Sequence, residues 1–329
     1  MATTLDPFHP RPHISGPSFA PIREILPRLR ITKHKLRQLQ LIQSIRENRD
    51  RHTQEVAFNA RPFVLCGLPL RPLPADQLVY KRRNGKFFLQ IVAHPDFGLP
   101  FGQDRLIPIW VATLALRQKS RTVHFDRAAQ MLEFFSLPKD GRYYRRMVQG
   151  FQRIFASTIF FGTEDQPSGG RLMDWGRFHF FDKTHLWFTD QSDGALLSAT
   201  NSANTITLSD AFYTEIDQHR VPMEREIVIA LANSPGVLDF YVWIAWRSWV
   251  LKSATARVPL FAAGGLKEQL GCQIHGDDRF LRRRINQWLR VIRAHWPQCP
   301  AEISPDGHSL VISPSKLSPA FHPQAAVNL

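Results

Sequence analysis

The sequence predicts a mainly helical α+β fold in which one structural unit occurs twice. A helix that carries both an apolar stripe and an arginine stripe appears at two places, 137 residues apart. An apolar helix, a short strand and a further helix precede each copy, and a segment typical of a β-hairpin follows it. The repeated mixture of helices with hairpins indicates the α+β class.

The two arginine helices are defined by residues that share one side of a helical wheel. At about 100° per residue, the polar positions fall on one face and the apolar positions on the other. The polar positions are Arg142, Arg145, Arg146, Gln149 and Arg153 in the first copy, and Arg279, Arg282, Arg283, Asn286 and Arg290 in the second. The apolar positions are Tyr144, Val148, Phe151 and Phe155, and Leu281, Ile285, Trp288 and Ile292.

The sign of the charge on these helices favours nucleic-acid binding. The stretch from Arg279 to Arg293 holds six arginines and no acidic residue. A face that is merely solvated usually mixes both signs in pairs three or four residues apart. Arginine and amide side chains can reach phosphates and the edges of bases in the major groove. An ordinary solvated face is the alternative, and the duplication counts against it.

The segments before the arginine helices repeat in the same order. Apolar helices are expected at residues 107–116 and 238–251, followed by the pairs Lys119-Ser120 and Lys252-Ser253. Short strands are expected at residues 122–125 and 258–261. Further helices are expected at residues 128–135 and 266–270, so that each arginine helix is the third helix of its unit.

Hairpins are expected after both arginine helices. In the first copy, a turn at Gly169-Gly170 leads into a strand at 171–181, and Asp182-Lys183 turns the chain back into residues 185–189. In the second copy, strands at 301–304 and 308–313 flank Pro305-Asp306-Gly307, which is a strong turn signal. A winged helix has the order helix, strand, helix, helix and hairpin, and its third helix enters the major groove. A generic α+β domain with this order is the alternative.

Composition and charge define five segments. Residues 1–60 form a basic, proline-rich extension with a helix at 33–48, residues 61–190 the first winged-helix domain and residues 191–204 a linker. Residues 205–313 form the second winged-helix domain, and Ser209 or Asp210 is expected to cap its first helix. Residues 314–329 form a flexible tail. The helix at 33–48 carries a narrow apolar seam. Three roles stay open for this segment: an arm that contacts DNA, a helix that binds a second copy or a host protein, and simple packing onto the first domain. The seam comprises Leu36, Leu39, Ile42 and Ile45.

The overall charge agrees with a polyanionic partner. Lys and Arg number 42 against 28 Asp and Glu, giving a net charge of +14. The longest apolar runs are shorter than the roughly 20 residues of a membrane span, and the N-terminus lacks a signal-peptide pattern. A cytoplasmic protein without membrane contact is expected. Cys66, Cys272 and Cys299 show no metal-binding spacing, so we expect buried free thiols and neither metal nor cofactor.

Motifs for catalysis on DNA are missing from the sequence. No GxxxxGK[ST] loop is present for ATP, and HExxH and GxSxG are absent as well. A nicking enzyme would need two histidines flanking one apolar residue together with a tyrosine nucleophile. Tyr143 and Tyr144 lie on the first arginine helix, but no such histidine pair occurs, and His179 stands alone between two phenylalanines. We therefore expect a protein that is not an enzyme.

Two long segments resemble a known family. Residues 101–162 read FGQDRLIPIWVATLALRQKSRTVHFDRAAQMLEFFSLPKDGRYYRRMVQGFQRIFASTIFFG, and residues 205–248 read TITLSDAFYTEIDQHRVPMEREIVIALANSPGVLDFYVWIAWRS. The layout of apolar, basic and turn positions from about residue 90 to 312 is similar to the RepA-type plasmid replication initiators. The resemblance implies a bacterial initiator with two winged-helix domains that binds repeated origin sites (iterons), melts adjacent DNA and recruits host initiator and helicase proteins.

The expected mechanism is binding of double-stranded DNA through two helices in successive major grooves, as a monomer or a homodimer. A transcriptional regulator or autorepressor is the first alternative, and a DNA-nicking enzyme is the second. The second unit, with its longer basic run, is expected to carry more of the sequence-specific affinity. The residues expected to contact DNA are Lys119, Arg121, Arg142, Arg145, Arg146, Gln149, Arg153, Arg171, Lys183, Lys252, Arg279, Arg282, Arg283, Asn286, Arg290 and Arg293.

Overall fold

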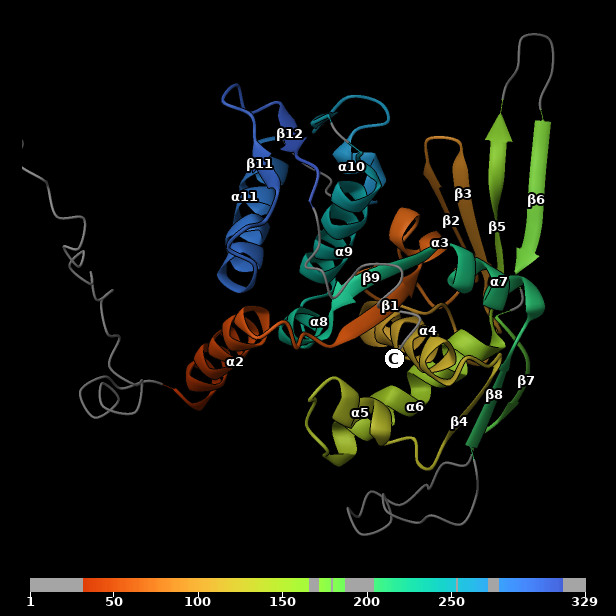
Figure 1. Cartoon of the computed structure of the whole chain (residues 1–329). Helices are drawn as coiled ribbons and strands as arrows, with labels where there is room; N and C mark the ends of the chain where they lie inside the picture. Colours follow the sequence, from red (N-terminus) through yellow and green to blue (C-terminus); the bar gives the residue numbers. More distant parts are fainter. Residues whose placement is uncertain are drawn as a thin grey trace, which may run out of the picture. The chain divides into compact units, whose positions relative to one another are not determined.

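The structure is a computed structural model that describes residues 32–165, 172–178, 180–186, 204–252, 254–271 and 278–315. The chain divides into two compact units, residues 1–40 and 41–329, and the described sheets lie in the second. Helices and strands mix along the chain, in agreement with the expected α+β class. The elements, drawn in Figure 1, are α2 (Lys33–Asp50), β1 (Val56–Ala60), α3 (Arg61–Leu65), β2 (Val79–Asn84), β3 (Phe87–Val92), the 3-10 helix η2 (Gly102–Arg105), α4 (Leu106–Gln118), β4 (Thr122–Phe125), α5 (Gln130–Phe134), α6 (Gly141–Ala156), β5 (Thr158–Asp165), β6 (Leu172–Phe178), β7 (Phe181–His185), β8 (Asn204–Leu208), α7 (Asp210–Gln218), β9 (Arg220–Glu224), α8 (Arg225–Leu231), α9 (Pro235–Val250), β10 (Ala256–Pro259), α10 (Leu266–Gln269), α11 (Asp278–His295), β11 (Ala301–Ile303) and β12 (Ser309–Ile312).

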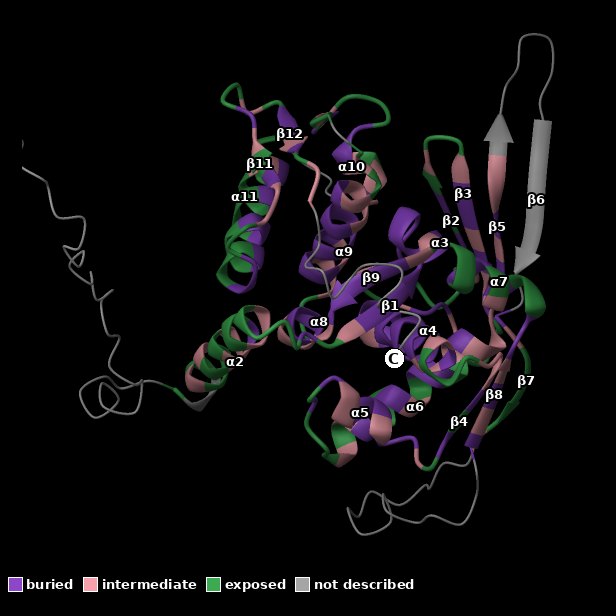
Figure 2. Cartoon of the chain, viewed as in Figure 1, coloured by how far each residue is buried: buried purple, intermediate pink, exposed green. Residues whose placement is uncertain are grey.

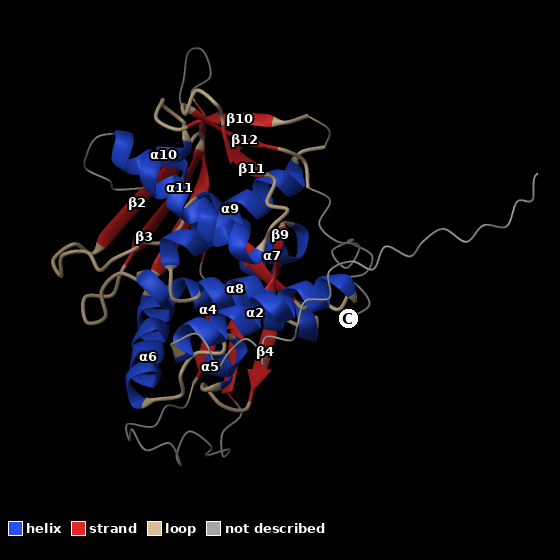
Figure 3. Cartoon of the chain, turned by 90° about the vertical axis from the view of Figure 1, so that its left-hand side faces the viewer, coloured by secondary structure: helices blue, strands red, loops and turns tan. Residues whose placement is uncertain are grey.

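Two three-stranded sheets repeat the same strand order. In the first sheet, the strand order is β4-β8-β7, and β7 and β8 come after α4, β4, α5 and α6 in the chain. α9, β10, α10 and α11 are followed by β11 and β12, with the sheet order β10-β12-β11, close to α11 and α9 (Figure 3). All of these strand pairs are antiparallel. We call α4 to β8 the first repeat and α9 to β12 the second repeat.

The hairpin after α6 differs from the expected one. β5 pairs with β6, and both extend β2 and β3 into a separate four-stranded sheet of order β2-β3-β5-β6. The expected turn at Asp182-Lys183 is a register shift inside β7, between Phe181 and Lys183. A bulge and a tight turn favour similar short polar residues, so the local pattern could not separate them. The β5–β6 hairpin is therefore an insertion within the first repeat.

The segment expected to be a linker connects two paired strands. β7 and β8 are antiparallel neighbours, with Lys183 opposite Thr207 and His185 opposite Thr205. Residues 191–203 between them lie outside the described residues. Because β8 also pairs with β4, the sheet of the first repeat is complete only at Leu208. The elements on either side of the expected linker thus belong to one sheet.

β1 and β9, which are distant in sequence, form a two-stranded ribbon. β1 and β9 are antiparallel, with Val56 opposite Glu224 and Ala60 opposite Arg220, and each strand leads directly into a short helix. Both strands are largely buried. Figure 2 shows buried residues concentrated along this ribbon and along α4 and α9, which are apolar on nearly all sides. The two apolar helices expected from the sequence therefore form the centre of the core.

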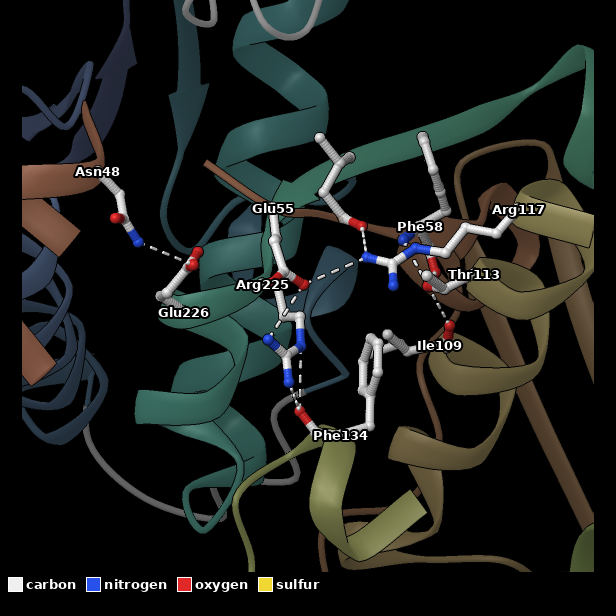
Figure 4. Close-up of polar contacts among 10 residues, drawn as sticks. Asn48, Glu55, Phe58, Ile109, Thr113, Arg117, Phe134, Arg225 and Glu226 are labelled. Atoms are coloured by element: carbon white, nitrogen blue, oxygen red, sulfur yellow. Dashed lines mark hydrogen bonds and ion pairs between the residues drawn. The ribbon is translucent and has the colours of Figure 1, made fainter. Parts of the chain in front are cut away.

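Polar contacts reinforce the junction beside this ribbon. Arg225 at the start of α8 donates to the carbonyl oxygen of Phe134, at 2.9 Å from Nη2, and to Glu55, at 3.1 Å (Figure 4). Arg117 at the end of α4 reaches the same carboxylate at 3.5 Å. The guanidinium of Arg225 also lies 4.7 Å from the centre of the Phe134 ring. These contacts tie α4 and α5 of the first repeat to α8.

The expected helix at 33–48 is present as α2. Within residues 41–50, Ile45 is buried in the core, Arg49 forms an ion pair of 2.9 Å with Glu224, and Asn48 donates to Glu226. This part of α2 therefore packs against β9 and α8. The expected cap of α7 is also confirmed, because the hydroxyl of Ser209 accepts from the backbone nitrogen of Phe212.

The described cysteines are free thiols. Cys66 is buried and Cys299 is half-buried, while Cys272 lies outside the described residues. Burial raises the pKa of the Cys66 thiol to about 11, against a smaller lowering effect of Arg82. Cys66 is therefore a protonated core residue at neutral pH.

Replacing His295 by Gln is expected to reduce the loss of stability on acidification. His295 is buried in the last turn of α11, and burial, together with the charge of Arg49, lowers its pKa from 6.5. The unfolded chain takes up this proton near pH 6.5, whereas the folded protein takes it up only at lower pH. The contribution of His295 to the free energy of unfolding therefore falls as pH drops below about 6.5.

Urea unfolding of both proteins, above and below that pH, measures this contribution. The stability of the wild type relative to His295→Gln should decline on acidification. A difference that stays the same at both pH values would contradict the proposed protonation.

Candidate nucleic-acid interface

The α6 helix presents most of its predicted stripe to solvent. Arg142, Arg145, Arg146 and Gln149 are exposed. The opposite face is buried through Tyr144, Met147, Phe151 and Ile154. Asp140 caps the helix by accepting from the backbone nitrogen of Tyr143 at 2.9 Å, so the helix begins just before the arginines. The amphipathic helix predicted from the sequence is confirmed.

Arg153 differs from the other arginines of α6. Its side chain is 11% exposed and forms two bonds to Asp104, which is 4% exposed, with Nε to Oδ2 at 2.7 Å and Nη2 to Oδ1 at 2.9 Å. Asp104 also accepts from the backbone nitrogen of Phe101. Gly150 lies over this pair, and a Cβ there would come within 2.7 Å of Asp104 Oδ1. Arg153 therefore fixes α6 to η2, and we remove it from the set of DNA contacts.

A hydrogen-bond chain connects the exposed face of α6 to the segment before α9. Arg146 Nη1 donates to Gln103 Oε1 at 3.1 Å, and Gln103 Nε2 donates to Asn233 Oδ1 at 2.7 Å. The hydroxyl of Tyr143 lies 3.4 Å from the same Asn233 oxygen. Arg142 and Arg146 both hold their guanidinium groups within 6 Å of the Tyr143 ring. The spacing pattern did not reveal this chain, because Gln103 lies 43 residues before Arg146 and Asn233 lies 90 residues after Tyr143.

The α11 helix repeats the arrangement in the second repeat. Leu281, Ile285, Trp288 and Ile292 are buried. The opposite side exposes Arg279, Arg283, Asn286, Arg290 and Arg293. The exposed amide of Asn286 donates to the carbonyl oxygen of Arg282, one turn earlier. Arg293 also donates to the carbonyl oxygen of Ala301, so it connects the end of α11 to β11.

Arg282 supports the hairpin that follows α11. It is half-buried, its guanidinium lies 5.5 Å from the Phe261 ring, and its Nε approaches the turn at Gly307. That turn is held by Asp306, which accepts from the Ser304 hydroxyl and from the backbone nitrogen of His308. The Ser304 hydrogen bond is the main cause of the lowered pKa of Asp306. The hairpin is therefore ordered beside the start of α11.

The predicted backbone-contact residues have different surroundings. Lys119 is exposed, in a left-handed conformation at the end of α4, and Lys183 and Lys252 are exposed as well. Arg121 is 38% exposed and pairs with Asp210 at 2.6 Å and Asp182 at 3.2 Å, so a phosphate would compete with two carboxylates. The predicted contact Arg171 lies outside the described residues.

Two features are absent from the described part of the chain. No group of three or more His, Cys, Asp or Glu side chains there is arranged to hold a metal ion. No described helix combines the length and apolar character that crossing a membrane requires.

The repeated unit and its exposed arginine helices are the features of a nucleic-acid-binding protein. Residues 141–261 match the family model described as plasmid encoded RepA protein, from the first residue of α6 to the segment before α10. The expected resemblance to RepA-type proteins is thereby confirmed over these residues.

The solved structures to which the chain is similar include two of RctB. The chain is 11% identical to the structure of selenomethionine derivatives of domains 2 and 3, with a TM-score of 0.46, covering 68% of this chain and 80% of that one. It is 13% identical to the structure of RctB domains 2–3, with a TM-score of 0.45, covering 74% and 92%. These TM-scores are too low to define a shared fold. No curated protein sequence matches the chain.

Proposed function

We propose that this protein initiates plasmid replication by binding repeated sites in the origin through two winged-helix units. The observation that carries the proposal is the shared topology of the repeats, in which an exposed arginine helix comes third and the first strand pairs with the last. This order, with sheets β4-β8-β7 and β10-β12-β11, supports the proposal that each repeat is a winged helix. The proposed units are residues 106–208, with β5–β6 inserted, and residues 235–312.

In the proposed complex, α6 and α11 lie in successive major grooves of one duplex. Arginine suits the two acceptors of guanine, and glutamine or asparagine suits adenine. Arg145 and Gln149 in α6 and Arg283 and Asn286 in α11 combine these groups on exposed faces. The turn at Gly307 lies beside the start of α11, so the hairpin is positioned to follow the DNA backbone.

The proposed work is binding without a catalytic step. Melting of adjacent DNA and recruitment of host replication proteins would follow from assembly on the repeats. A plasmid that carries the origin and supplies the protein from a separate, switchable gene tests this role. Loss of the plasmid when the gene is switched off supports initiation. Continued replication, with changed expression from the adjacent promoter, would instead support a transcriptional regulator.

Replacing Lys119 and Lys252 by Ala is expected to weaken binding to all DNA sequences alike. Both lysines are exposed and occupy equivalent places at the ends of α4 and α9. A backbone contact reads charge and not sequence, so each loss should lower the salt dependence of binding by about one counterion. Titrations of origin and random duplexes at several salt concentrations measure both quantities. A loss confined to origin DNA would show that these lysines read bases.

A further inference from the structure

The β2–β3 hairpin is a basic surface that lies outside both repeats. Residues 79–92 contain Lys81, Arg82, Arg83 and Lys86 and no acidic residue. Lys81, Arg83 and Lys86 are exposed, whereas Arg82 is 8% exposed. The alternation follows from the strand period of two, which directs successive side chains to opposite faces. A two-residue turn with Gly85 at a φ of +58° brings Lys86 to the tip.

The buried Arg82 fixes this hairpin to the second repeat. Its guanidinium donates to the carbonyl oxygen of Gly67 at 3.1 Å and to that of Gln269, the last residue of α10, at 2.5 Å. A Cβ at Gly271 would lie 2.5 Å from the central carbon of this guanidinium, so a larger residue there would have to displace the Arg82 side chain. The hairpin is therefore held at the connection between α10 and α11.

This attachment places the basic hairpin beside α10, the helix that precedes α11 in the chain. α11 begins nine residues after Gln269, and its first exposed arginines are Arg279 and Arg283. On the left of Figure 3, the β2–β3 hairpin lies below α10 and above α6, and in Figure 1 it lies to the right of α10 at about the same height. A duplex that spans α6 and α11 would pass the hairpin.

We propose that the β2–β3 hairpin binds DNA phosphates between the stretches read by α6 and α11, through Lys81, Arg83 and Lys86. This proposal rests on the proposed function and adds a contact that neither repeat supplies. Three cations on a short, rigid ribbon match the close spacing of phosphates on a duplex. Because the hairpin is anchored to α10, its contact also restricts how the duplex leaves α11.

The double variant Lys81→Ala with Lys86→Ala tests the contact. Its matched control is Arg46→Ala with Arg51→Ala, which removes the same charge from exposed positions outside the hairpin and both repeats. For the hairpin variant, the slope of log affinity against log salt should fall by about 0.9 for each lost phosphate contact. The control should keep the wild-type slope, and thermal unfolding should show that both variants are folded.

The outcomes separate this proposal from the proposed function. Failure of the wild type to bind origin DNA would overturn both. If the wild type binds origin DNA but the hairpin variant and its control have equal salt slopes, only the proposed hairpin contact is overturned. Arg82→Lys keeps the charge but loses the two-pronged anchor, and it should also lower the slope. An unchanged slope for that variant would show that the anchor does not position the hairpin on DNA.

Discussion

Replacing Arg283 and Asn286 together by Ala is expected to remove most of the preference of the protein for its own origin repeats. Both side chains are exposed on α11, one turn apart in the predicted stripe. Each well-placed bidentate contact contributes about 1–3 kcal/mol of discrimination between bases, so the pair should contribute about 2–6 kcal/mol. Affinities for the origin repeat and for a scrambled duplex, measured at one salt concentration, give this difference directly.

The helix itself offers a matched control. Arg284 and Gln287 are also exposed, but each lies one position further around the helix, away from the stripe. The double variant Arg284→Ala with Gln287→Ala removes the same charge and the same kind of amide. It should lower the affinity for origin and scrambled DNA by the same factor. Equal loss of discrimination in the two double variants would show that the stripe does not define the reading face.

Replacing Asp104 by Ala is expected to lower the free energy of unfolding by about 3–5 kcal/mol, because it leaves the buried guanidinium of Arg153 without its partner. Asp104 is 4% exposed and also accepts from the backbone nitrogen of Phe101. The start of α4 and the end of α6 should loosen together. Urea unfolding, followed by tryptophan fluorescence, measures the loss.

Lys139→Ala is the control for this stability prediction. Lys139 also pairs with a carboxylate, Glu133, at 2.7 Å, but its side chain is 57% exposed. Removing such a surface pair should cost no more than about 1 kcal/mol. If Asp104→Ala were no more destabilising than Lys139→Ala, the Arg153 pair would not hold α6 in place, and Arg153 would return to the set of candidate DNA contacts.

Local periodicity was sufficient to predict the two arginine helices. The stripes of α6 and α11 depend on positions three and four residues apart, and the structure exposes and buries them as expected, apart from Arg153 and Arg282. These two exceptions have partners that are distant in sequence. Asp104 lies 49 residues before Arg153, and Phe261 and Gly307 approach Arg282 from opposite directions along the chain.

Pairing between strands that are distant in sequence was the part that the sequence could not supply. The pattern around Asp182-Lys183 indicates a turn, yet the structure uses it as a bulge, because β7 pairs with β8 across the intervening residues 186–203. The sequence predicts no strand at β5, whose pairing with β3 depends on residues more than 60 positions earlier. The basic hairpin was likewise missed, because its relation to α10 depends on the contact from Arg82 to Gln269.

Hydroxyl-radical footprinting of the origin tests the central claim, that two helices read successive grooves, most directly. The wild type should protect two stretches in each repeat, on one face of the duplex and about one helical turn (10 base pairs) apart. Arg145→Ala with Gln149→Ala should remove one stretch, and Arg283→Ala with Asn286→Ala the other. A single protected stretch that survives the α6 variant, or two stretches that disappear together in both variants, would contradict the claim.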